Sequence, residues 1–277
     1  VELTTFTSNN DRYVVLENSL VDINEGRLIR GTVNSVITSD VTKIDSFAFD
    51  KLPLTEISIY PTVTHIGVQA FAYCPIEHLV LPYSVTRVDS QAFTRCSELK
   101  SVVFSQRMTD IPTYGFAYCY NLGDVEIPSN IEEILEGAFR SCNKMSTLTL
   151  NNGLKYIGKV AFANCSGLSS VTVPNTVTSI DSGAFQDCPN LTSIILSSQL
   201  TELKPNTLKN TGISEIRIPD AVTTITSSAF TSCSALTAIT IPNSVTSIGR
   251  YAFSGCIFTK DKFVNNSSLS AEENNYW

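Results

Sequence analysis

The chain has 277 residues, a formal net charge of −7 and a pI of about 4.9, and 16% of its residues are charged. An acidic chain without a cluster of lysine and arginine argues against a nucleic-acid partner. No apolar run reaches the length of about 18 residues that a membrane-spanning helix requires, so we expect no membrane span.

Residues 1–34 contain short apolar runs that are separated by turn signals. The runs Tyr-Val-Val-Leu and Leu-Val-Asp-Ile are divided by Asn18-Ser19, and Asn24-Glu25-Gly26 follows. Short β runs divided by Asn and Gly are typical of β-hairpins. We therefore predict an N-terminal β-hairpin cap over residues 1–34.

Residues 35–256 are organised around a repeat of 22 or 23 residues. An aromatic ring recurs with this period, once replaced by leucine, and cysteine follows three residues later in most units. No unrelated set of loops would keep this register over so long a segment, so the repeat indicates a solenoid. The ring column is Phe49, Phe71, Phe93, Phe116, Phe139, Phe162, Phe185, Leu208, Phe230 and Phe253. The cysteine column is Cys74, Cys96, Cys119, Cys142, Cys165, Cys188, Cys233 and Cys256.

Each unit contains two extended segments and a closing turn. In the unit at residues 168–190, Val171 and Val173 alternate with polar residues, which indicates a strand with one buried face. Val177 and Ile180 mark a second, short extended segment, and the Ala-Phe-x-x-Cys stretch is expected to close the coil as a tight helical turn. Parallel strands joined by crossovers favour a right-handed coil. We predict a β-rich α/β right-handed solenoid of about ten coils, with a parallel sheet on one face and short helical or 3-10 turns.

The pattern departs from its consensus at two places. One coil carries Leu203, Leu208 and Thr211 where the others have Ile, Phe and Cys, so we expect a packing defect or bend there. After Cys256 the pattern stops, and residues 257–277 are polar. We interpret this segment as a C-terminal tail, a cap or a linker.

The cysteines permit two interpretations. Neighbouring coils would place their Cα atoms about 4.8 Å apart, which is within disulfide range. The side chains of one column point the same way into a packed interior, however, which favours buried free thiols that act as small hydrophobic residues. A regular column does not converge on a point as metal ligands must, so we expect neither a metal nor a cofactor.

No arrangement typical of catalysis occurs in the sequence. His65 and His78 stand outside any nucleophile or zinc motif, and the densest acidic group, at residues 132–136, is better explained as a solvated face. We therefore expect no catalytic residues and no enzymatic activity.

A partner surface is suggested by aromatic residues that gather in the N-terminal half. The residue before each cysteine should point outward, and in three successive coils it is Tyr73, Arg95 and Tyr118. Tyrosine and arginine are favoured at interface hot spots, but a Tyr–Arg–Tyr stack can also stabilise only itself. The candidate partner-binding residues are Tyr60, Tyr73, Tyr83, Arg95, Tyr118 and Tyr120.

The unit at residues 236–256 reads Leu-Thr-Ala-Ile-Thr-Ile-Pro-Asn-Ser-Val-Thr-Ser-Ile-Gly-Arg-Tyr-Ala-Phe-Ser-Gly-Cys. Units of this kind resemble the BspA-type leucine-rich repeats of Bacteroides-type surface proteins. The resemblance extends over residues 35–256. Residues 263–277 resemble segments that follow such arrays, and the chain starts at Val1 without methionine, so we expect trimmed ends.

The resemblance implies a leucine-rich-repeat solenoid that works as a secreted or cell-surface binding module without catalysis. It implies adhesion to host matrix proteins such as fibronectin and fibrinogen, or to other cells, by an extracellular and monomeric protein. Two alternatives are a structural spacer that presents another domain and a glycan-binding accessory domain. The partner would be a protein or a glycan.

Overall fold

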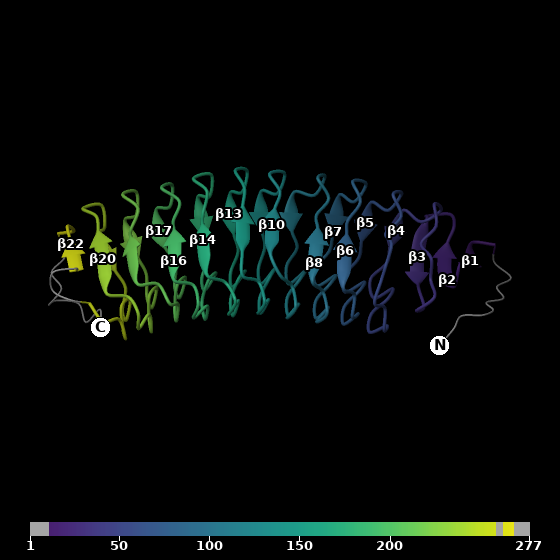
Figure 1. Ribbon diagram of the computed structural model, residues 1–277. Helices are drawn as coiled ribbons and strands as arrows, with labels where there is room; N and C mark the ends of the chain where they lie inside the picture. Colours follow the sequence, from purple (N-terminus) through teal and green to yellow (C-terminus); the bar gives the residue numbers. More distant parts are fainter. Residues whose placement is uncertain (1–10, 259–262, 269–277) are drawn as a thin grey trace.

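The computed structural model describes residues 11–258 and 263–268, and these residues form one elongated β-solenoid (Figure 1). The solenoid has about nine turns with repeats of about 23 residues, and the strands of successive coils run parallel. Strands β1 (Tyr13–Leu16), β2 (Ser19–Asp22) and β3 (Arg27–Arg30) lie at one end of the stack, and β22 (Phe263–Asn265) lies at the other. The predicted solenoid with parallel sheets is confirmed.

The first strand column comes from the alternating Val-x-Val type segments. In β6, β14, β16 and β18 the central residue is buried while its neighbours face solvent, whereas in β10 the two end residues are buried and the central one is exposed. Alternate residues of a strand point to opposite faces, so the apolar set enters the core. The strands are β6 (His78–Val80), β8 (Ser101–Val103), β10 (Val125–Ile127), β12 (Leu148–Leu150), β14 (Ser170–Thr172), β16 (Ser193–Ile195), β18 (Glu215–Arg217) and β20 (Ala238–Ile241).

The second column consists of two-residue strands. Each ends in an apolar residue that is buried in nearly every coil, and these residues lie opposite one another in register, as Ile134 does with Ile157. The strands are β4 (Lys43–Ile44), β5 (His65–Ile66), β7 (Arg87–Val88), β9 (Asp110–Ile111), β11 (Glu133–Ile134), β13 (Tyr156–Ile157), β15 (Ser179–Ile180), β17 (Glu202–Leu203), β19 (Thr224–Ile225) and β21 (Ser247–Ile248).

The two ends extend these ladders. Strands β1 (Tyr13–Leu16), β2 (Ser19–Asp22) and β3 (Arg27–Arg30) form an antiparallel meander, and β3 pairs in parallel with β4. At the other end, β22 (Phe263–Asn265) pairs in parallel with β20, so the ladder continues past the last cysteine. We propose that the meander is the cap of residues 1–34. Residues 1–10 of that cap, and residues 259–262 and 269–277 of the predicted tail, lie outside the described residues.

The two strand columns are interrupted together at two coil boundaries, and one of these interruptions has a clear local cause. The first column has a further gap between β12 and β14, where Thr147 and Ser170 form only an isolated bridge. Strands β7 and β9 do not pair, nor do β8 and β10. In neighbouring coils the residue after the short strand donates its amide across the boundary, as Leu135 does to the Ile111 carbonyl at 3.0 Å. Pro112 stands at that position and has no amide hydrogen.

The second interruption lies at the coil that carries Leu203, Leu208 and Thr211. Strands β15 and β17 do not pair there, nor do β16 and β18. Leu208 also leaves a gap in the aromatic stack between Phe185 and Phe230. The coil that departs from the consensus therefore marks a break in both strand columns and in the aromatic stack, although amides such as Phe185 still bond across it, to the Thr207 carbonyl at 3.0 Å.

The closing segment differs from the helical or 3-10 turn that the sequence suggested. Its amides alternate: Phe47, Phe49 and Lys51 donate to carbonyls of the next coil at 2.7–2.9 Å, whereas the residues between them donate three residues back. Two positions per coil, four residues apart, have a left-handed backbone with φ between 49° and 63° where they are not glycine. A helix cannot contain such residues regularly, so the segment is a third inter-coil ladder built from turns.

We call the second of these left-handed positions, directly before the cysteine column, the edge column. Left-handed residues cost about 1–2 kcal/mol each, which the cross-coil hydrogen bonds of the same segment offset. Its members are Lys51, Tyr73, Arg95, Tyr118, Ser141, Asn164, Asp187, Asn210, Ser232 and Gly255.

The core is a stack of phenylalanine rings beside a column of thiols. Successive rings from Phe49 to Phe185 lie 4.9–5.7 Å apart with interplanar angles up to 14°, and all are fully buried. The cysteines are free. Each thiol lies 3.0–3.3 Å from the carbonyl oxygen of the ring-column residue one coil earlier, as Cys142 does from Phe116. The thiols therefore join the coils as hydrogen-bond donors besides filling volume.

Candidate functional site

The six candidate partner-binding residues fall on two different surfaces. Tyr60 and Tyr83 follow the first strand column, where the coil turns towards the second column. Tyr73, Arg95 and Tyr118 lie in the edge column, and Tyr120 is two residues beyond it, before the next strand. The predicted cluster is therefore divided between two connections at different ends of the strands.

The first surface is an apolar patch on the outward face of the first column. Val80 and Val103 are opposite each other in the register of β6 and β8 and are 60% and 56% exposed. Tyr83 is 69% exposed and has the Arg107 guanidinium 5.8 Å from its ring centroid, and Tyr60 is 41% exposed. We call Tyr60, Val80, Tyr83 and Val103 the strand-face patch. Exposed apolar clusters of this kind mark interaction surfaces.

Two shallow depressions adjoin this patch where the first column is unpaired. Residues 57–59 form no strand, so β6 begins the ladder. A depression of about 570 Å³ lies between this segment and His78. A second depression, of about 530 Å³, extends from the same segment to Tyr60 and to the loop around Val36. Tyr60 is the patch residue that lines the second of these depressions.

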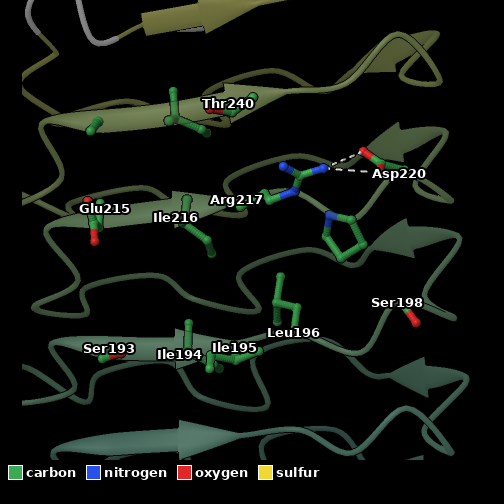
Figure 2. Close-up of a pocket in the computed structure, with 13 residues that line it drawn as sticks. Ser193, Ile194, Ile195, Leu196, Ser198, Glu215, Ile216, Arg217, Asp220 and Thr240 are labelled. Atoms are coloured by element: carbon green, nitrogen blue, oxygen red, sulfur yellow. Dashed lines mark hydrogen bonds and ion pairs between the residues drawn. The ribbon is translucent and has the colours of Figure 1, made fainter.

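A third depression of about 860 Å³ lies over β16, β18 and β20 (Figure 2). It coincides with the unpaired boundary between β16 and β18. Ile195, which lines it, is 61% exposed, and the exposed side chains of Arg217 and Asp220 form an ion pair at 3.1 Å. The third charged residue of this depression is Glu215, so the depression offers one exposed aliphatic side chain, an ion pair and one carboxylate.

The second surface is an alternating stack of cations and tyrosines along the edge column. Lys51 Nζ lies 5.5 Å from the Tyr73 ring centroid, and the Arg95 guanidinium carbon lies 5.6 Å from the same ring. Arg95 is also 4.7 Å from the Tyr118 ring, which has Arg140 of the next coil at 6.0 Å. We call Lys51, Tyr73, Arg95, Tyr118 and Arg140 the cation–tyrosine ladder. Cation–π contacts at exposed sites are worth about 0.5–1 kcal/mol each.

The charges of this ladder differ in how they are paired. Lys51 Nζ is 3.6 Å from Asp50. Among the described residues, neither Arg95 nor Arg140 has a carboxylate oxygen within 4.0 Å. Tyr120 completes the surface, with its ring 6.3 Å from that of Tyr118 in an edge-on arrangement.

Each of the two histidines contacts a side chain of another coil. His65 Nε2 lies 2.7 Å from Asp89 Oδ2, and His78 Nδ1 lies 2.8 Å from Ser101 Oγ on the strand face. Burial acts to raise the pKa of Asp89, but hydrogen bonds from His65 and Arg87 outweigh it and lower that pKa. In the part of the chain that the structure describes, no three His, Cys, Asp or Glu side chains are grouped to hold a metal ion.

Sequence reasoning missed two features of these surfaces. The left-handed backbone of the edge column carries no glycine signature, because lysine, tyrosine, arginine and asparagine occupy most of it. The extension of the Tyr–Arg–Tyr stack by Lys51 and Arg140 was also missed. Lys51 lies in the coil before Tyr73 and is followed by Leu52, which occupies the position of the cysteine column. Following the edge column through all coils would have found Lys51.

No described helix has the length and apolar character of a membrane-crossing segment. Similar solved structures include a leucine-rich repeat protein from Bacteroides ovatus, with 21% identity, 90% of this chain and 84% of that chain covered and a TM-score of 0.55. The pneumococcal vaccine antigen PcpA has 15% identity, coverage of 94% and 78% and a TM-score of 0.52. A leucine rich cell surface protein from Faecalibacterium prausnitzii has 26% identity, coverage of 97% and 96% and a TM-score of 0.40.

The first two structures share the fold of this chain. No curated protein was found to match the sequence. A family model described as the BspA type leucine rich repeat region matches residues 31–146 and 109–237 in six copies. Because these matches extend over well more than half of the sequence, the chain belongs to the BspA type leucine-rich repeat family.

Proposed function

We propose that the chain is a non-enzymatic, extracellular binding module that acts in adhesion, and that a protein partner docks on the strand-face patch. The observation that carries this proposal is the exposure of Val80 and Val103 on one face of the β6–β8 sheet, with Tyr83 exposed in the turn that follows β6. Apolar and tyrosine side chains at this exposure supply the anchors of protein interfaces.

The family supports the same function. Leucine-rich repeat arrays are binding modules that use extended, regularly spaced surfaces, and the resemblance given above is to bacterial surface proteins. Limited protease treatment of intact source cells tests the location: the chain should be lost without lysis. Persistence of the chain under conditions that remove a known surface protein would contradict an extracellular location.

The binding test uses substitutions that other coils of this fold already contain. Thr149, Thr172 and Thr240 occupy the column position of Val80 and Val103. The double variant Val80→Thr, Val103→Thr should therefore fold normally while the apolar patch is lost. Immobilised fibronectin and fibrinogen are the probes, with binding measured by biolayer interferometry.

We expect the double variant to bind either probe at least roughly tenfold more weakly, because two exposed apolar anchors are removed. Ile195→Thr is the matched control, since it removes a similarly exposed residue of the same column in a distant coil. Wild-type chain that binds neither probe would favour the structural spacer. Equal loss in the control and the double variant would place the partner elsewhere.

A further inference from the structure

The cation–tyrosine ladder is built so that only its edge is open to a ligand. Lys51 comes from the coil before Tyr73 and Arg95 from the coil after it, so the two cations cover opposite faces of that ring. Arg95 and Arg140 flank Tyr118 in the same way. A base or an aromatic side chain therefore has no free ring face to stack on, in contrast to the platforms that bind single-stranded nucleic acids.

What the edge offers is a row of hydrogen-bond donors. A guanidinium that is held between two rings has both faces covered, while its N–H groups lie in the plane of the group and point past the rings. Arg95 is exposed and Tyr73 is 47% exposed, so the donors of these two residues reach solvent, while Tyr118 and Arg140 are half-buried and the Arg140 Nε atom is buried. The ring contacts also restrict the rotamers of Arg95 in advance, which lowers the entropy cost of binding an anion.

The spacing of the charges selects among anions. Along the edge column a cation alternates with a neutral phenol, in the order Lys51, Tyr73, Arg95, Tyr118, and Arg140 follows in the next coil. Successive core rings beside this column are 4.9–5.7 Å apart, which is comparable with the length of one sugar residue in an extended polysaccharide. If one sugar residue spans one coil, one cation in every two coils matches a polysaccharide in which every second sugar is acidic.

The rest of the chain provides a contrast within the same fold. Beyond Tyr118 the edge column contains Ser141, Asn164, Asp187, Asn210, Ser232 and Gly255. These positions have the same backbone conformation and supply neither a cation nor an aromatic ring. The chain as a whole is acidic, with a net charge of −7, so a polyanion would be repelled except where unpaired cations are concentrated.

We propose that the cation–tyrosine ladder is a binding site for an acidic polysaccharide in which a carboxylated sugar alternates with a neutral one. Arg95 and Arg140 would hold the carboxylates, and the tyrosine hydroxyls would bind the hydroxyl groups of the sugars between them. Glu98, the nearest acidic residue after Arg95 in the sequence, accepts a hydrogen bond from Asn121 at 3.0 Å. The site is separate from the strand-face patch, so either proposal can fail while the other holds.

The test measures binding of hyaluronan oligosaccharides, which alternate one uronate with one neutral sugar, by isothermal titration calorimetry on the full chain. Arg95→Asn and Tyr118→Asn are suitable variants, because Asn164 and Asn210 already occupy the edge column. Arg250→Asn is the matched control for charge, since Arg250 is an exposed cation in the last coil. Circular dichroism melting confirms that each variant is folded.

We expect hyaluronan oligosaccharides to bind, and to bind more weakly as salt is raised. Arg95→Asn should weaken binding by roughly tenfold or more, because a charge-assisted hydrogen bond is lost, and Arg250→Asn should leave it unchanged. Val80→Thr, Val103→Thr should also leave it unchanged.

Three results would overturn the proposal. The first is that the wild-type chain does not bind hyaluronan oligosaccharides. The second is that Arg95→Asn binds them as tightly as the wild type does. The third is binding of a neutral glucan oligosaccharide, of polyglutamate or of oligodeoxythymidylate that is as tight as that of hyaluronan.

Discussion

Replacing Phe139 tests whether the ring stack holds the coils together. Its ring is fully buried between Phe116 at 5.7 Å and Phe162 at 5.5 Å, and Phe104 meets it edge-on at 6.3 Å. Phe139→Ala removes these contacts and leaves a cavity that the flanking coils cannot fill, because each is fixed by its own ladder bonds. We expect a loss of about 3–5 kcal/mol in the free energy of unfolding. That is a large share of the total for a domain, which is about 5–15 kcal/mol.

Urea unfolding followed by far-UV circular dichroism measures this loss. Phe139→Leu should cost only about 1–2 kcal/mol, since leucine keeps much of the volume and Leu208 already occupies the same column. Phe47→Ala is the control, because Phe47 is 47% exposed and its replacement should change stability by about 0.5 kcal/mol or less. A loss below about 1 kcal/mol for Phe139→Ala would refute the idea that the stack is a main source of stability.

Three further predictions concern the cap, the thiols and a buried hydroxyl. A Cβ at Gly31 would lie 1.9 Å from the Phe49 ring, so Gly31→Ala should lower the free energy of unfolding in urea by about 1–3 kcal/mol. Gly123→Ala is the control, because the nearest atom to its Cβ would be 3.4 Å away, and it should cost less than half of that free energy. Burial raises the pKa of Cys119 from 9.0 to about 12. The unfolded chain thus releases this proton first, and stability that is complete below pH 9 should fall as pH rises towards 12. Cys119→Ala should reduce this fall in the free energy of unfolding by about 1.4 kcal/mol per pH unit. If the free energy of unfolding fell equally steeply with pH in the wild type and in Cys119→Ala, the raised pKa of Cys119 would be contradicted. Ser197 is fully buried and donates to a carbonyl of the preceding coil at 2.6 Å, so Ser197→Ala should lower the free energy of unfolding by about 1–3 kcal/mol, as measured by thermal melting.

The sequence predicted the arrangement of the coils because packing imposes a period on it. Every coil must present the same apolar side chains to its neighbours, so the ring and cysteine columns and both strand columns can be followed along the chain. The break at Leu208 could be predicted for the same reason, as a departure from the period. The break at Pro112 was missed, although the sequence contains its cause, because it depends on one amide hydrogen and not on an apolar position.

Features that depend on backbone conformation or on single polar atoms were not predictable from the period. Left-handed residues of the edge column include Tyr73 and Arg95, whose side chains do not reveal their φ angles. The thiol–carbonyl bonds were hidden because cysteine fits a small apolar position equally well. The division of the tyrosines between two surfaces follows from their places within the coil, since Tyr83 follows a strand whereas Tyr118 precedes a cysteine.

The column of thiols has a consequence for how unfolding can be observed. Most coils contain one cysteine, and a thiol inside an intact coil is shielded from reagents in the solvent. Alkylation followed by mass spectrometry would therefore count how many coils have opened, and peptide mapping would show from which end the opening proceeds. The protein has a natural set of reporter groups, one for nearly every layer, that needs no engineered label.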